Sequence, residues 1–122
     1  MDRKEELISQ IEEDLLILTL SMGIKVLKND DSFNVLDHKN YRLFAIYIEE
    51  AKIGYRYKVL LNYEGKLGNI NIRGSHNIVE SYDEEVVYSK VKKMIDAIVE
   101  NDGTVKRTYI DDGFEVKRSG ES

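Results

Sequence analysis

The sequence predicts an α+β fold in which two helices pack on one face of a mostly antiparallel sheet of five to seven strands. Three observations predict it. Apolar residues recur at helical spacing near the N-terminus and again after residue 81, they alternate in the stretches between, and clusters of Asn, Asp and Gly separate those stretches. Because 122 residues suffice for one core, we expect a single domain over residues 1–118 and a frayed tail over 119–122.

The first helix is predicted over residues 2–22, and Gly23 follows it where a left-handed C-cap belongs. The second helix begins at Ser81-Tyr82-Asp83-Glu84, which has the form of a capping box, and Asn101-Asp102-Gly103 ends it. Each helix carries one apolar stripe toward the sheet. The stripes are Leu7, Ile8, Ile11, Leu15, Leu18 and Met22 in the first helix, and Val87, Val91, Met94, Ile95 and Ile98 in the second.

Five strands are predicted between the helices, and two more form a hairpin after the second helix, across Asp111-Asp112-Gly113. Asn62 to Lys66 is predicted to turn the chain, and Gly74 to Asn77 to be a loop. The expected strands are 24–28, 32–37, 41–48, 54–61, 67–73, 104–110 and 114–117.

Composition excludes several classes of protein. Cysteine is absent, which rules out disulfides, Cys-based zinc sites and thiol catalysis. Apolar runs such as Leu15 to Leu18 are far too short to span a bilayer, so no membrane partner is expected. The first residues, MDRKEE, carry acids where a signal peptide needs a basic start and an apolar stretch, which predicts a cytoplasmic protein.

The stretch RGSHN, Arg73 to Asn77, gathers residue types that are common in catalytic sites. Ser75 and His76 are adjacent, however, and in an extended chain adjacent side chains point to opposite faces. A serine–histidine pair is therefore excluded within this stretch, and the sequence predicts no catalytic residue there.

Metal and acid–base chemistry are also poorly supported. His38 and His76 lie in separate predicted loops, and Asp30-Asp31 is ordinary turn composition. Glu49-Glu50, at the end of the third predicted strand, is the nearest candidate for a carboxylate pair, but a solvated edge is the simpler interpretation. We therefore predict a protein that is not an enzyme, with no metal site and no cofactor.

The second half of the first helix has more apolar residues than one buried stripe requires. Leu16, Ile17 and Leu20 point away from the stripe at about 100° per residue. Either the second helix or another protein chain must cover them. We favour an interface with another chain, a second copy of the protein being the first candidate.

The net charge of −5 is unevenly distributed. Acids gather in the two predicted helices, and those of the first helix form a face that would steer a basic protein partner toward the interface. Solubilising charge is the alternative explanation for them. The face consists of Glu5, Glu6, Glu12, Glu13 and Asp14. The leading hypothesis is thus a homodimeric protein-binding protein, such as a regulator, an inhibitor or an adaptor of the chaperone or immunity type.

The alternative hypothesis is binding of RNA or single-stranded DNA on the sheet, where cations interleave with tyrosines. Alternation counts against it, because Tyr55 and Tyr57 fall on the face opposite to Arg56 and Lys58. The cations of this alternative face are Arg42, Arg56, Lys58, Lys66 and Arg73.

Overall fold

A computed structural model describes residues 2–67 and 69–100, and the side chains of residues 63–67, 71 and 72 fall outside that description. Helix α1 (Arg3–Met22) comes first, five strands follow, and helix α2 (Glu84–Glu100) comes last. The strands are β1 (Lys25–Lys28), β2 (Ser32–Leu36), β3 (Arg42–Glu50), β4 (Tyr55–Leu67) and β5 (Ile70–Ser81). The predicted α+β class is confirmed, and the predicted hairpin after α2 lies outside the described residues.

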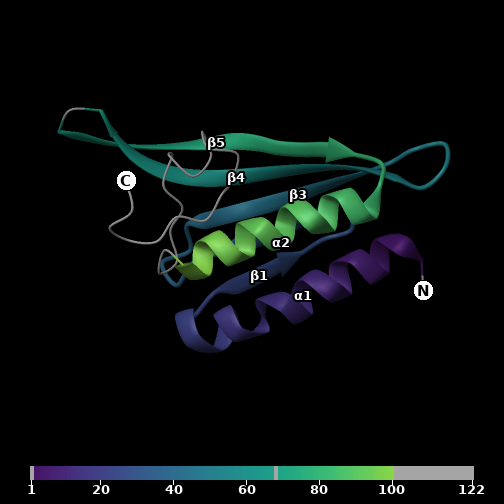
Figure 1. The fold of residues 1–122 in the computed structure, drawn as a ribbon, viewed down its shortest axis with the longest axis horizontal. Coiled ribbons are helices and arrows are strands. Elements are labelled where there is room, and N and C mark those ends of the chain that lie inside the picture. The colour runs from purple at the N-terminus through teal and green to yellow at the C-terminus, as the bar shows by residue number, and fades with distance from the viewer. Residues whose placement is uncertain (1, 68, 101–122) are drawn as a thin grey trace.

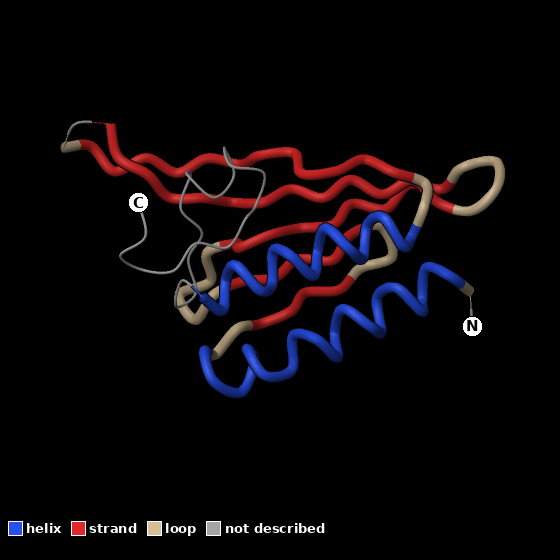
Figure 2. Tube along the Cα trace, viewed as in Figure 1, coloured by secondary structure: helices blue, strands red, loops and turns tan. Residues whose placement is uncertain are grey.

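The five strands form one antiparallel sheet in sequence order, β1 to β5. Both helices lie on the same face of this sheet, α1 beside the β1 edge and α2 next to it (Figures 1 and 2). The other face, which neither helix covers, is called the open face below. No helix among residues 2–67 and 69–100 is long and apolar enough to cross a membrane.

Local capping determines both ends of α1. The Asp2 side chain accepts a hydrogen bond from the Glu5 backbone N–H at 2.8 Å, which satisfies one of the unpaired N–H groups of the first turn. Gly23 ends the helix with φ +67°, the left-handed conformation that glycine adopts most readily. The predicted C-cap is therefore confirmed.

The start of α2 differs from the prediction by two residues. Asp83, rather than Ser81, is the N-cap, since its carboxylate accepts from the Glu85 N–H at 2.9 Å. Ser81 instead accepts from the Asp83 N–H at 3.0 Å and orients the capping residue. A hydroxyl and a carboxylate two residues apart compete for the same role, and the carboxylate interacts better with the positive end of the helix dipole.

The hairpin of β4 and β5 is longer than predicted, and two turn assignments were wrong. Asn62 to Lys66 continues β4, and Gly74 to Asn77 lies inside β5, where Gly74 is opposite Tyr63 and Ser75 is opposite Asn62. The ladder contains a register shift at Val59/Leu60. Local turn composition is outweighed here because each residue of a long hairpin gains cross-strand hydrogen bonds.

The core lies between the helices and one face of β2, β3 and β4. Paired positions across the three strands are buried together, as in Val35 with Phe44 and Phe44 with Leu61. The predicted stripes of α1 and α2 cover this face, and Met22 alone among them is only partly buried. The outward half of α1 is thus left to solvent, whereas exposure varies over the open face, where Ala45 is buried.

Candidate functional site

Three large apolar side chains on the outward half of α1 are exposed. Leu16 is 55% exposed, Ile17 74% and Leu20 80%, whereas the neighbouring Leu15 and Leu18 are 1% exposed. We call Leu16, Ile17 and Leu20 the α1 patch. Isolated apolar residues are normal on a surface, but three within two turns of one helix form a contiguous candidate contact.

Helix α2 packs against α1 without covering the α1 patch. The Tyr88 hydroxyl donates a hydrogen bond to Asp14, and the Arg3 guanidinium pairs with Glu84 at 3.1 Å. These contacts lie on the flank of α1 and join the two helices side by side. Of the two explanations for the apolar surplus, cover by the second helix is therefore excluded within the described residues.

The predicted acidic face is divided between two roles. Glu5, Glu6 and Glu13 are exposed, and Glu12 pairs with Lys28 at 2.9 Å. Asp14 is half-buried between the helices, and its hydrogen bond raises the pKa of Tyr88. Asp14 thus helps to hold α2 against α1 and Glu12 is engaged with Lys28, which leaves Glu5, Glu6 and Glu13 as the exposed acids of the predicted face that form no ion pair within the described residues.

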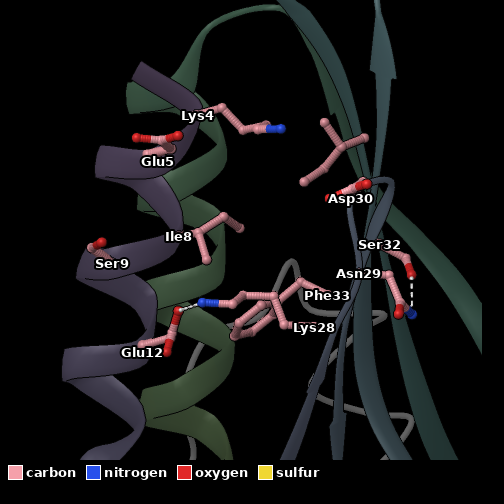
Figure 3. Close-up of a pocket in the computed structure, with 11 residues that line it drawn as sticks. Lys4, Glu5, Ile8, Ser9, Glu12, Lys28, Asn29, Asp30, Ser32 and Phe33 are labelled. Atoms are coloured by element: carbon pink, nitrogen blue, oxygen red, sulfur yellow. Dashed lines mark hydrogen bonds and ion pairs between the residues drawn. The ribbon is translucent and has the colours of Figure 1, made fainter. Parts of the chain in front are cut away.

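A cleft of about 430 Å³ opens between the first half of α1 and the turn that joins β1 to β2 (Figure 3). Its apolar floor is Ile8, Phe33 and Ile48, and the Lys28–Glu12 pair crosses it. Lys4, on its rim, has its ammonium 4.8 Å from the centre of the Tyr55 ring. The volume suits a small ligand, but both cations are already engaged with side chains of the protein.

A second cleft shares the Lys4 edge and brings two predicted acidic pairs to one end of the sheet. Asp30 and Asp31 line it together with Glu49 and Glu50. Even so, no group of three His, Asp or Glu side chains in the described part of the chain is placed to hold a metal ion.

Tyr57, in β4, links the sheet to both helices. It is fully buried, and its hydroxyl donates a hydrogen bond of 2.9 Å to Glu84, which Arg3 also holds. Burial, and then the hydrogen bond to Glu84, raise the pKa of Tyr57 well above its ordinary value of 10. The neutral phenol is therefore the form that the fold stabilises.

Because this pKa is raised, the contribution of Tyr57 is present below pH 10 and is lost as the pH rises above it, where the unfolded chain ionises. We expect the free energy of unfolding of the wild type to fall above pH 10 by up to about 1.4 kcal/mol per pH unit more than that of Tyr57→Phe. Urea denaturation between pH 8 and pH 11, followed by circular dichroism, measures this. Tyr82→Phe, at an exposed position, is the control and should run parallel to the wild type. If the Tyr57→Phe curve also runs parallel to the wild type, the buried phenol does not have the role assigned to it.

The RGSHN stretch is part of the β4–β5 ladder and not a loop. In β5, Ser75 pairs with Asn62 and His76 with Leu61, so their side chains alternate between the two faces. Both are exposed. Sequence alone did not indicate a strand here, because Gly74 and Asn77 favour a turn.

The predicted basic residues lie on the sheet as follows. Arg42 donates hydrogen bonds to the Asn62 side chain and the Tyr47 hydroxyl, both at 2.9 Å. Arg56 pairs with Glu80 and, at 3.7 Å, with Glu49, while Lys58 is 3.9 Å from Glu80. Arg73 lies over the Tyr41 ring, and Lys66 is opposite Asn71 in the ladder.

No family model, no curated protein and no solved structure matches this chain. Its function must therefore be argued from its own residues.

Proposed function

We propose that the protein is a non-catalytic binding protein that associates with a second copy of itself through the α1 patch. The observation that supports this is the exposure of Leu16, Ile17 and Leu20 on a helix whose opposite stripe is buried and whose flank is already occupied by α2. A two-fold contact sets the same patch against itself, so one surface provides both halves of the interface.

The charges on α1 select an antiparallel arrangement of the two copies. Glu12 and Glu13 lie just before the patch, Lys28 offsets only Glu12, and the last turn of α1 has no basic residue. In a parallel pair these acids would face their counterparts, and like charges in contact are unfavourable. An antiparallel pair brings the patches together and directs the two acidic halves away from each other.

The size of the patch indicates a weak dimer. Burying one exposed aliphatic side chain stabilises a complex by about 1.5–3 kcal/mol, and six such side chains meet in the dimer. Association itself costs about 4–15 kcal/mol in lost freedom. The two quantities are comparable, so we expect a dissociation constant that is micromolar or weaker. Polar neighbours of the patch would complete the contact.

The salt dependence of association distinguishes self-association from binding of a basic partner, since salt weakens contacts between opposite charges. Each copy has a net charge of −5, so raising the salt concentration screens their repulsion and should strengthen the dimer. Sedimentation equilibrium of the wild type at low and moderate salt measures the dissociation constant. A dimer that weakens as salt rises would contradict the apolar, like-charged contact proposed here. A protein that stays monomeric at every salt concentration would contradict self-association altogether.

A further inference from the structure

The centre of the open face has no acidic side chain. The strand register places two neighbouring rows on it, each with one residue from every strand. The rows are Leu27, Asn34, Ala45, Leu60 and Asn77, and Lys25, Leu36, Arg42, Asn62 and Ser75. Acids make up 23 of the 122 residues, yet these ten positions hold none and include two cations. The negative charge of the protein is thus carried elsewhere, in large part by the helices.

Two exposed tyrosine rings lie beside these rows, each in contact with a guanidinium. Tyr47 is 39% exposed, and Arg42 donates to its hydroxyl. Tyr41 is 49% exposed, and the guanidinium carbon of Arg73 is 3.7 Å from its ring centre. Arg73 alternates with Ser75 in β5 and therefore belongs to the open face, where it lies opposite Glu64 of β4.

The alternation predicted within β4 is confirmed, and the tyrosines of β4 are not the rings that accompany the cations of the open face. Tyr55 and Tyr57 do turn toward the helices, Tyr57 completely, while Arg56 and Lys58 turn the other way. The rings that share a surface with cations come instead from β3 and the residue before it. Only the register between strands brings Tyr41 and Tyr47 together with Arg42 and Arg73.

The cations of the open face have different partners at its two ends, one marked by Arg56 and Lys58 and the other by Arg42. Arg56 and Lys58 are close to Glu49 and Glu80, which neutralise that end. Arg42 is held by two neutral groups, Asn62 and Tyr47, which orient the guanidinium without offsetting its charge. An anionic ligand would therefore meet, at Arg42, a positive charge whose hydrogen-bond partners are both neutral, whereas Arg73 lies opposite Glu64 in the ladder.

We propose that the open face binds single-stranded RNA, with bases stacked on Tyr41 and Tyr47 and a phosphate held by Arg42. Bases can stack on a flat aromatic surface only when they are unpaired, which selects a single strand. The amide and hydroxyl groups of Asn34, Asn62 and Ser75 lie in the same rows and can both donate to and accept from a ribose 2′-hydroxyl, which selects RNA.

Fluorescence anisotropy with labelled mixed-sequence single-stranded RNA, titrated at several salt concentrations, tests the proposal. For one phosphate contact, at Arg42, we expect the logarithm of the association constant to fall with log salt at a slope of about −0.7. Tyr41→Ala and Tyr47→Ala should each weaken binding about fivefold or more through lost stacking. Arg42→Gln should reduce the slope by about 0.7.

Matched variants keep the result interpretable. Tyr82→Ala removes an exposed ring outside the open face, and Lys93→Gln removes an exposed charge from α2, so neither should change binding. Tyr47→Phe keeps the ring and loses only the hydrogen bond to Arg42, so it should bind within about twofold of the wild type if stacking is the dominant interaction.

Four results would overturn the proposal. They are the absence of any anisotropy change at low salt, equal losses in the control variants, tighter binding of DNA of the same sequence, and tighter binding of duplex RNA. If an acidic polypeptide binds the protein and the Tyr41→Ala and Tyr47→Ala variants retain RNA binding, the open face is a general anion surface and the stacking assignment is wrong.

Discussion

Replacing Leu15 by alanine is expected to lower the free energy of unfolding by about 2–5 kcal/mol, whereas the same replacement at Leu16 should change it by less than about 0.5 kcal/mol. The two leucines are neighbours in one helix, so helix propensity affects both variants alike. They differ in burial, since Leu15 is 1% exposed in the core and Leu16 belongs to the α1 patch. Urea denaturation followed by circular dichroism measures both, at a protein concentration below the dimer dissociation constant so that association does not contribute.

Leu18→Ala and Leu20→Ala repeat the comparison one turn further along α1. Leu18 is buried and Leu20 is exposed, so the first variant should behave like Leu15→Ala and the second like Leu16→Ala. If Leu16→Ala and Leu20→Ala were the destabilising pair, the outward half of α1 would be buried within the monomer. The α1 patch would then not be available to another chain.

Both helices were predictable from sequence because their signals are local. The apolar stripe of α1 recurs at helical spacing, Gly23 supplies the left-handed residue that ends it, and the same phase places Leu16 and Leu20 on the outward side. The hypothesis of an interface on α1 depended only on this helical spacing, which shows which side of the helix each residue occupies. It did not need the position of α2, although the structure was required to exclude α2 as the cover.

The β4–β5 hairpin was predicted less well because its length depends on pairing between residues distant in sequence. Asn62 to Lys66 and Gly74 to Asn77 favour turns when each is considered alone. In the fold they lie opposite one another, Asn62 with Ser75 and Gly65 with Ile72, and the ladder stabilises both as strands. A single sequence does not show which of two competing segments will find a partner.

The open face was the least predictable feature, since it depends on register across several strands. Tyr47 and Arg42 are five residues apart in β3, an odd separation that strict alternation would place on opposite faces. An irregularity in the β2–β3 ladder between Val35 and Leu36 shifts the register near Arg42, and Arg42 reaches the Tyr47 hydroxyl on the open face. Local alternation gives no sign of such an irregularity.

The double variant Leu16→Glu, Leu20→Glu is expected to weaken self-association by at least about 100-fold, equivalent to about 2.8 kcal/mol. It replaces apolar contact by carboxylates that would be desolvated against the same patch of the other copy. Both positions are exposed in the monomer, so the fold itself should be retained. Circular dichroism of the variant should match that of the wild type.

The matched control is Ile53→Glu with Val86→Glu, which adds the same two charges at exposed apolar positions outside the α1 patch. The control should associate like the wild type once the added net charge is screened by moderate salt. Any loss that it shares with the patch variant reflects net charge and not the contact.

Sedimentation velocity of the wild type, the patch variant and the control, each over a range of micromolar concentrations at moderate salt, tests the central claim most directly. The account predicts that the wild type and the control shift from monomer to dimer as concentration rises, while Leu16→Glu, Leu20→Glu remains monomeric throughout. A wild type that stays monomeric over the whole range, or a patch variant that dimerises as readily as the control, would contradict it.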